Sequence, residues 1–230
     1  MADTMPPLPP EPPHAPPPPG PEPLPWERPG YPFLEGLYET AKLILTEPSQ
    51  AFARVSLAAD LGRPIFYAVL FGWIGVVASQ LYNLAFHGAI MSLMPMMGRG
   101  GGFAVPTAWS LAMMVLAPVF VVISVFLWSA IVHLCLMLVG AATSGFAATV
   151  RVVCYGSTVQ ILNVVPFCGG LIAAIWAIVL QIIGLAVVHR TSQGKAALAV
   201  LLPLLLCCAC GVLAALGLGV GIAGLVSRFR

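Results

Sequence analysis

Most of this 230-residue chain lacks acidic residues. All eight Asp and Glu residues lie within the first 60 positions, and none occurs from Leu61 to Arg230. Charged residues make up only 8% of the chain, whereas hydrophobic residues make up 60%. A soluble domain carries about 25% charged residues, so this chain has too little charge to cover a surface that faces water. A water-soluble fold is therefore excluded.

The missing carboxylates also limit the chemistry available to the apolar part of the chain. Intramembrane aspartyl hydrolysis needs buried Asp, and carriers coupled to protons or sodium usually rely on buried Asp or Glu. Serine hydrolysis would need a buried acid and a Gly-x-Ser-x-Gly turn, which the segment CYGST at 154–158 does not supply. We therefore expect a protein that is not an enzyme and that binds no cofactor.

The spacing typical of metal sites is missing as well. The six cysteines, at 135, 154, 168, 207, 208 and 210, lack the paired two-residue gaps and matching histidines of a zinc site. We expect them to behave as small apolar side chains. The methionines within residues 91–97 are soft thioether ligands suited to Cu(I), although an apolar loop resting on the membrane is the preferred interpretation. No metal site is predicted.

Charge is divided unevenly along the chain. The first 60 residues hold three basic and eight acidic residues, whereas the remaining 170 hold seven basic residues and no acid. The formal net charge of +2 hides this division. It gives no reason to expect a nucleic-acid partner.

A proline-rich tail opens the chain. Residues 1–32 contain 15 of the 22 prolines. Proline fixes its own backbone torsion and donates no hydrogen bond, so a disordered tail with polyproline II character is predicted for residues 1–32. A solvated spacer is the simplest interpretation, and a ligand for a protein partner with a proline-recognising groove is the alternative.

An amphipathic region follows at residues 33–62. Within residues 33–47, apolar side chains recur at spacings of three and four, so they share one helical face. This face consists of Leu34, Leu37, Tyr38, Ala41 and Leu45. The stretch is too short and too charged to span a membrane, so we expect cytoplasmic helices that lie in the membrane interface.

Five apolar segments follow within residues 63–226, each long enough to cross about 30 Å of hydrocarbon. The expected spans are 64–86, a stretch within 107–139 that contains Pro118, 148–165, 169–188 and 195–224. The predicted fold is an all-α integral membrane protein with a bundle of five transmembrane helices. The segment PFCGG at 166–170 is a tight turn that joins the third and fourth spans into a hairpin.

The positive charges predict the orientation of the bundle. With the N-terminus in the cytoplasm, six Lys and Arg residues lie on inner segments and three on outer segments. Cytoplasmic segments carry the excess of positive charge in membrane proteins. A cytoplasmic N-terminus and an outer C-terminus are therefore predicted.

Polar side chains recur at three- and four-residue spacing in the first and third expected spans. With one glutamine of the fourth span they form the candidate polar face of the bundle interior: Gln80, Asn83, Tyr155, Ser157, Gln160, Asn163 and Gln181. Such groups are unfavourable against lipid, so they turn inward and bond across helices. Adhesion between helices is the preferred interpretation of this face, and a binding cavity is the alternative.

Two residues of this face lie at matching distances from the PFCGG turn. Tyr155 precedes Pro166 by 11 residues and Gln181 follows Gly170 by 11, so both lie about 16 Å from the turn. We therefore predict that Tyr155 and Gln181 are neighbours in the hairpin.

Small residues in the fifth span permit close helix packing. Gly217 and Gly221 form a GxxxG pair, which lets two backbones approach each other. The partner helix belongs either to the same chain or to a second copy, so a homo-oligomer is one possible assembly.

Three segments resemble the Yip family of multi-pass membrane proteins, which includes Ypt/Rab-interacting proteins. They are ILTEPSQAF, YGSTVQILNVVPFCGGLIAAIW and GLAVVHRTSQGKAALAVLL, and the resemblance covers roughly residues 38–224. The family-like positions include Pro48, Phe52, Pro166, Phe167, Gly169, His189 and Lys195.

The resemblance implies a five-helix membrane bundle with a cytosolic N-terminus. Eukaryotic members are linked to vesicle trafficking and Rab GTPases, but their acidic-Leu-Tyr-Gly-Pro-type motif is missing before Pro48. The chain is more similar to the bacterial branch, which implies a bacterial cytoplasmic membrane. We expect a non-enzymatic protein that organises membrane or partner proteins. The alternative is a small carrier or channel for a neutral solute or a soft metal ion.

Overall fold

The structure is a computed structural model that describes residues 22–93 and 107–228, and every regular element in these ranges is a helix. The first elements are η1 (Pro25–Glu27), α1 (Phe33–Thr46), α2 (Pro48–Ala53) and α3 (Gly62–Leu93). They are followed by α4 (Thr107–Leu138), α5 (Phe146–Gly156), η2 (Ser157–Val164), α6 (Gly169–Val188) and α7 (Gln193–Arg228). The predicted all-α class is confirmed.

Four of these helices are long and apolar enough to cross a membrane. They are Gly62–Phe86 in α3, Ala108–Leu138 in α4, Gly169–Val188 in α6 and Gln193–Gly211 in α7. Large apolar side chains such as Val115 and Leu171 are exposed along them, as is expected of side chains that face lipid. The first, second, fourth and fifth predicted spans each correspond to one of these helices.

The third predicted span, 148–165, is not one continuous α-helix. It consists of the 11-residue α5 and the 8-residue 3₁₀ helix η2. A 3₁₀ helix rises about 2.0 Å per residue and an α-helix about 1.5 Å, so the two pieces together cover roughly 33 Å. The segment is therefore as long as a membrane span, although its second part is wound differently from the prediction.

Contacts between loops and helices define the two ends of the bundle. We call one end of the bundle the N-terminal end. There the loop after α4 reaches the last turn of α6, and the Ser144 hydroxyl donates to the Val188 carbonyl at 2.7 Å. We call the other end the turn end. There the ring centroids of Phe167 and of Phe86 in α3 lie 5.5 Å apart. The segment α5–η2 runs from the first end to the second, beside α3 and α6.

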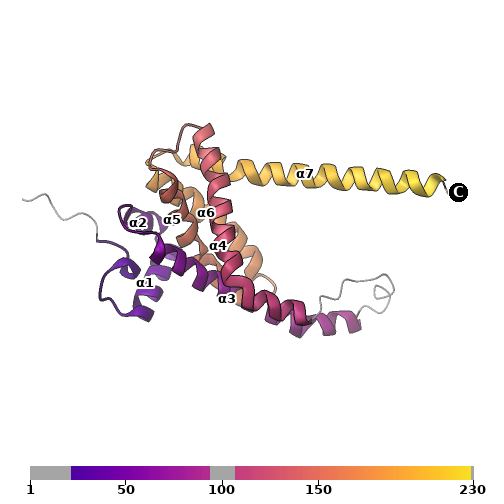
Figure 1. The fold of residues 1–230 in the computed structure, drawn as a ribbon, viewed down its shortest axis with the longest axis horizontal. Helices are drawn as coiled ribbons and strands as arrows, with labels where there is room; N and C mark the ends of the chain where they lie inside the picture. The colour runs from indigo at the N-terminus through magenta and orange to yellow at the C-terminus, as the bar shows by residue number, and fades with distance from the viewer. Residues whose placement is uncertain (1–21, 94–106, 229–230) are drawn as a thin grey trace, which may run out of the picture.

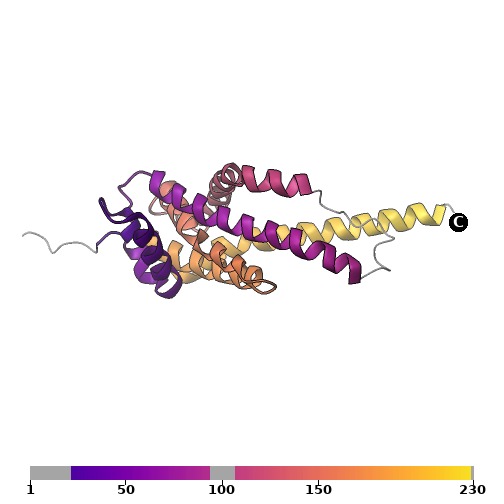
Figure 2. The same ribbon diagram turned by 90° about the horizontal axis from the view of Figure 1, so that it is seen from below.

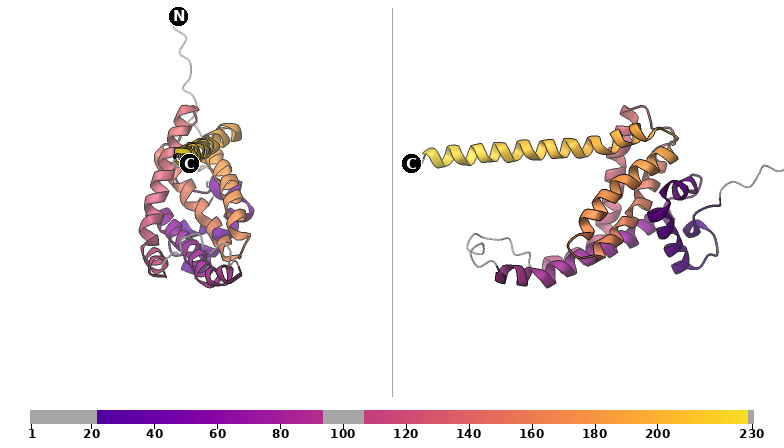
Figure 3. Two further views of the ribbon diagram at one scale, coloured as in Figure 1. Left: turned by 90° about the vertical axis from the view of Figure 1, so that its right-hand side faces the viewer. Right: turned by 180° about the vertical axis from the view of Figure 1, so that it is seen from behind.

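The short helices pack against the N-terminal end, as Figure 3 shows for α1 and α2. Phe52 of α2 lies on Gly184 of α6, where an added Cβ would be 2.9 Å from the Phe52 ring and 2.7 Å from Val152. Only a glycine leaves room for this contact. The family-like residue Phe52 is therefore held against α6 by a complementary gap.

Only part of the predicted apolar face of α1 packs against the rest of the protein. Its buried residues are Gly36, Thr40, Ala41 and Ile44. Leu34 and Tyr38, which were expected to share a face with Ala41, are 74% and 63% exposed. The helix thus packs against the protein through small and medium side chains and leaves two large apolar side chains outside.

Part of the predicted disordered tail is folded onto the bundle. Leu24 is completely buried, and Pro25–Glu27 form a 3₁₀ turn beside α1. The predicted boundary at residue 32 is therefore too late, because the folded part already includes residues 24–32. Residues 1–21, with 11 of the 15 prolines of the predicted tail, lie outside the described residues.

Pro118 lies inside α4, which changes direction along its length in Figure 1. Proline has no N–H, so the Met114 carbonyl four residues earlier loses its helical partner. Trp73 of α3 replaces that partner, because its indole Nε1 donates to the Met114 oxygen at 2.9 Å. The bend in α4 is thereby coupled to its contact with α3. Helix α3 itself extends from the short helices along the bundle (Figure 2).

Helix α7 packs on the bundle only near its start. Ala196, Ala199 and Val200 are fully buried, whereas Leu205 and Leu206 are exposed. Figures 1 and 3 show the rest of α7 extending away from the other helices. The backbone of α7 continues to Arg228, but the surroundings of Gly217 and Gly221, where a homo-oligomer contact is predicted, lie outside what the structure describes.

Candidate functional site

The 3₁₀ winding of η2 aligns three polar side chains of the predicted polar face. Residues three apart eclipse one another in a 3₁₀ helix. Ser157, Gln160 and Asn163 therefore follow one edge of η2, here called the polar edge, and Asn163 Nδ2 donates to Gln160 Oε1 at 2.6 Å. An added Cβ on Gly75 of α3 would be 3.0 Å from Gln160 and 3.2 Å from Asn163, so α3 packs closely on this edge.

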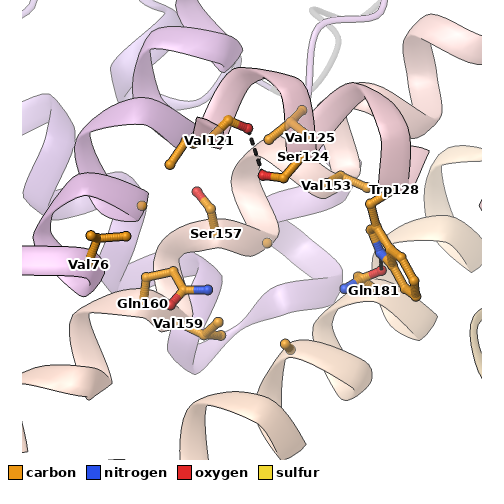
Figure 4. Close-up of a pocket in the computed structure, with 13 residues that line it drawn as sticks. Val76, Val121, Ser124, Val125, Trp128, Val153, Ser157, Val159, Gln160 and Gln181 are labelled. Atoms are coloured by element: carbon orange, nitrogen blue, oxygen red, sulfur yellow. Dashed lines mark hydrogen bonds between the residues drawn. The ribbon is translucent and has the colours of Figure 1, made fainter. Parts of the chain in front are cut away.

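A cavity of about 440 Å³ lies beside the polar edge, between α3, α4, α5, η2 and α6 (Figure 4). Its polar side chains are Ser124, Trp128, Ser157, Gln160 and Gln181, and the rest of its lining is Gly, Ala and Val. None of the lining residues is charged. We call this space the central cavity.

Trp128 of α4 determines which way the Gln181 amide faces. The Trp128 indole Nε1 donates to Gln181 Oε1 at 2.6 Å. An indole N–H can only donate, so it must meet the amide oxygen, and this turns the Gln181 NH₂ group into the cavity. Gln160 uses its oxygen in the same way, for Asn163, and Figure 4 shows the two amide nitrogens directed into the space between them.

The serine hydroxyls of the cavity face it as acceptors. Ser124 donates to the Val121 carbonyl at 2.9 Å, and Ser157 donates to the Cys154 carbonyl at 2.6 Å. Each hydroxyl proton is used by a backbone carbonyl three residues earlier in the chain, which leaves the oxygen lone pairs for another group. The central cavity therefore combines two amide donors with two hydroxyl acceptors.

A second cavity, of about 160 Å³, adjoins the first toward the turn end. It is lined by Gly75, Val76, Ser79, Gln80, Gln160 and Asn163. Val76 and Gln160 line both cavities, so the Gln160 side chain stands between them. Asn83, which was predicted to share the polar face with Gln80, is exposed and donates instead to the Ser79 carbonyl of its own helix at 3.0 Å.

Toward the N-terminal end, the bundle is closed by a layer of buried hydroxyls and rings. The Tyr67 hydroxyl bonds Thr158 Oγ1 at 2.8 Å, and the Tyr67 and Tyr155 rings lie 5.2 Å apart. Tyr155, Tyr67 and Thr158 are all completely buried. This layer joins α3 to α5 and η2 through a hydrogen bond and a ring contact.

Glu27 brings a carboxylate to this closed layer, from the segment predicted to be disordered. The Tyr155 hydroxyl donates to Glu27 Oε1 at 2.7 Å, and the Ser56 backbone N–H donates to Oε2 at 3.0 Å. Arg63 Nη1 donates to the Glu27 carbonyl at 2.6 Å, and Trp26 Nε1 donates back to the Arg63 carbonyl at 3.0 Å. Sequence reasoning missed this anchor, because 128 residues separate Glu27 from Tyr155.

The predicted pair Tyr155–Gln181 has the right depth but different partners. Tyr155 bonds Glu27 and Gln181 bonds Trp128. Gly156, next to Tyr155, does lie at the level of Gln181, because its added Cβ would be 3.9 Å from Gln181 Cγ. A tryptophan in an apolar helix needs an acceptor for its N–H, which is the signal that could have pointed to Trp128.

His189 lies in a hydrogen-bond chain at the N-terminal end. The Ser144 N–H donates to His189 Nδ1 at 3.2 Å, so Nδ1 carries no proton and Nε2–H faces Thr149 Oγ1 at 2.9 Å. Thr149 in turn lies 2.9 Å from His133 Nδ1. Burial, and then the neighbouring His133, lowers the pKa of His189 to about 4. The family-like residue His189 is therefore a neutral connector between the α4–α5 loop, α5 and α6.

The other family-like positions serve turns and helix starts. Pro48 is the first residue of α2. At Gly169 an added Cβ would overlap the Leu162 carbonyl, so only glycine fits there. Pro166 and Phe167 form the exposed turn, where Phe167 has a φ of 66°. Lys195 is exposed in the first turn of α7.

Arg151 is a buried cation of α5 that the polar-face prediction did not include. It is 3% exposed, and its guanidinium donates to the Ala59 and Ala147 carbonyls. It thereby holds the segment before α3 against α5. Within residues 22–93 and 107–228, no three His, Cys, Asp or Glu side chains come together in a way that would hold a metal.

Comparison with curated proteins and with solved structures gives no match. A family model does match: the Yip1 domain, over residues 42–215, which is well over half of the chain. The matched range includes the central cavity, the polar edge and the family-like positions, and it begins after the Glu27 anchor. This agrees with the resemblance of the three sequence segments, and the chain therefore belongs to the Yip family of multi-pass membrane proteins.

Proposed function

We propose that this protein is a non-enzymatic membrane protein that organises partner proteins, by presenting its proline-rich N-terminal segment from a fixed point on the bundle. The observation that carries the proposal is the Glu27–Tyr155 hydrogen bond, at 2.7 Å, between the end of that segment and the buried core. A freely solvated spacer would need no such attachment. The anchor fixes where residues 1–21 leave the bundle.

The anchor consists of more than one bond. Leu24 is completely buried and Trp26 stacks on Phe66 with 6.2 Å between ring centroids. The Trp26 backbone N–H also donates to Thr40 Oγ1 at 3.0 Å, which joins the segment to α1. Buried apolar area and several hydrogen bonds together offset the conformational entropy that a short segment loses when it is fixed in place.

We place five spans in the membrane, with α5–η2 as the third, and the N-terminus in the cytoplasm. The length of α5–η2, roughly 33 Å, supports this count. The cytoplasmic side is supported by Arg54, Arg63, Arg190 and Lys195, which all lie near the N-terminal end, because cytoplasmic segments carry the excess of positive charge. The exposed Leu34 and Tyr38 of α1 suit a helix that rests in the membrane interface.

Photocrosslinking in intact cells tests the presentation of the tail. A photoreactive residue placed within residues 1–21 should capture a defined set of proteins. Glu27→Ala should weaken this capture, because the tail then leaves from a mobile segment, whereas Glu22→Ala, on an exposed side chain, should leave it unchanged. Capture that is the same after residues 1–21 are replaced by a Gly/Ser stretch of equal length would contradict the proposal.

Reporter fusions test the topology separately. Alkaline phosphatase, which is active only outside the cytoplasm, should be active when fused after Arg228 and inactive when fused at the N-terminus. Activity at neither end would show an even number of spans and overturn the five-span arrangement.

A further inference from the structure

Helix adhesion does not explain the central cavity. A side-chain amide that serves adhesion uses its donors as well as its oxygen, but the NH₂ groups of Gln160 and Gln181 have no hydrogen-bond partner among the described residues. An unpaired donor in an apolar region is unfavourable, because it has lost its hydrogen bonds to water without a replacement. Two such donors directed into one space of about 440 Å³ indicate a ligand that satisfies them.

The lining defines the chemistry of that ligand. No lining residue is charged, so a charged group would enter without a counter-ion and at a high desolvation cost. The two NH₂ groups require hydrogen-bond acceptors, such as ester carbonyl oxygens, and the oxygens of Ser124 and Ser157 can accept from a hydroxyl. Gly, Ala and Val make up the rest of the wall, which suits hydrocarbon.

We propose that the central cavity binds an uncharged lipid that carries ester carbonyls and a free hydroxyl, of the diacylglycerol class. A volume of about 440 Å³ holds the glycerol unit, its two ester groups and the first carbons of each chain. The chains continue into the bilayer that surrounds the helices. The adjoining space of about 160 Å³ lies toward the turn end, and Gln80 and Asn163 add polar side chains to its lining.

We take the central cavity as a binding site and not as a passage for a solute. Tyr67, Tyr155 and Thr158 are completely buried, and their hydroxyls and rings contact one another. The carrier alternative for a neutral solute is tested below as a separate outcome.

Gly156 allows the cavity to be filled without removing a hydrogen bond. An added Cβ would meet only Gln181 Cγ within 4 Å, at 3.9 Å, and the backbone of Gly156 has helical torsions of −60° and −22°. Gly156→Leu therefore places its side chain in the cavity and also improves helix propensity. It is a steric block that keeps Trp128, Gln160 and Gln181 in place.

The experiment is photolabelling of the purified full-length protein in phosphatidylcholine vesicles, with a diacylglycerol that carries a diazirine near its ester groups. Labelled peptides should map to α3–α6, and unlabelled diacylglycerol should compete. We expect at least a tenfold loss of labelling in Gly156→Leu and a clear loss in Gln160→Met. Gln193→Leu, an exposed glutamine at the start of α7, should label like the wild type.

Several outcomes would overturn the proposal. Labelling that survives in a folded Gly156→Leu protein, or that is lost equally in Gln193→Leu, places the lipid elsewhere. Competition by phosphatidic acid as strong as that by diacylglycerol contradicts an uncharged ligand. Should Gly156→Leu fail to fold, Gln160→Met decides alone, and unchanged labelling in that variant rejects the site. Glycerol uptake by protein-containing vesicles above that of empty ones would show a passage instead.

Discussion

The two ends of the bundle are built differently. At the N-terminal end, Tyr67, Tyr155, Thr158 and His189 are completely buried and hydrogen-bonded. Toward the turn end, the polar edge of η2 borders two cavities and leaves amide groups unpaired. The same kinds of polar side chain thus serve two purposes in one bundle. Where these hydroxyl and ring groups have partners the helices are locked together, and where amide donors are left over there is space for a ligand.

The largest expected effect comes from a matched pair of glycine substitutions on the two sides of this comparison. Gly184→Leu should destabilise the protein by about 3 kcal/mol, because its Cβ alone would lie 2.7 Å from Val152 and 2.9 Å from Phe52. Gly156→Leu should be tolerated, since the cavity accepts the side chain. Thermal unfolding in detergent measures both. Equal losses of stability in the two variants would contradict the contrast between a tightly packed end and an end that contains cavities.

Removing the Glu27 carboxylate tests whether the N-terminal segment belongs to the locked end. Glu27→Ala leaves the buried Tyr155 hydroxyl without its acceptor, so we expect a loss of about 1–3 kcal/mol. The Trp26 backbone N–H, which donates to Thr40 Oγ1 in the anchored segment, should then exchange with solvent deuterium faster. Glu22→Ala, whose carboxylate pairs with Arg28 at the surface, serves as the control and should change stability little. Unchanged hydrogen exchange at Trp26 in Glu27→Ala would show that the anchor does not hold the segment.

Acidification should weaken the locked end through His189. Its pKa is lowered to about 4 in the folded protein, against about 6.5 in the unfolded chain, so the unfolded state binds more protons between these values. Stability should therefore fall as the pH drops from about 6.5 to about 4, by at most about 1.4 kcal/mol per pH unit. His189→Asn, whose side-chain oxygen can replace Nδ1 as acceptor for Ser144, should flatten this dependence. A profile equally steep in the variant would assign the effect to another group.

The smallest expected effect concerns a buried hydroxyl that has no partner in the described residues. Ser129 of α4 is completely buried, and its Oγ makes no hydrogen bond within residues 22–93 and 107–228. Ser129→Ala should leave stability unchanged or raise it by up to about 1 kcal/mol, because an unsatisfied polar group is removed. A loss above that size, measured by thermal unfolding, would reveal a hydrogen bond that this arrangement does not contain.

The helical class and four of the long apolar helices follow from composition and hydropathy alone, as does the turn at Pro166 and Phe167. The path of residues 24–32 did not follow, because a proline-rich composition favours an extended chain. The contacts that hold this stretch come from distant residues, such as Tyr155 for Glu27 and Arg63 for Trp26. Local sequence patterns carry no information about partners so far along the chain.

The candidate site was predicted in part. Spacing alone brought Gln160 and Asn163 onto one face, and this grouping agrees with the polar edge of η2. Spacing did not indicate the 3₁₀ winding, nor that Gln181 would bond Trp128 instead of a group near Tyr155. The bond between Gln181 and Trp128 depends on where α4 lies beside the hairpin, and α4 contains Pro118 and is bonded to Trp73 of α3 at Met114.

The winding of η2 has a consequence for the alignment of its side chains. If residues 157–164 wound as an α-helix, the segment would shorten by roughly 4 Å, and each residue of the polar edge would turn by about 60° from the one before it. Asn163 would then point to a different neighbour than Ser157, and the row of polar groups would fan out toward the acyl chains. A change of helical pitch over two turns is thus sufficient to assemble or dismantle this row.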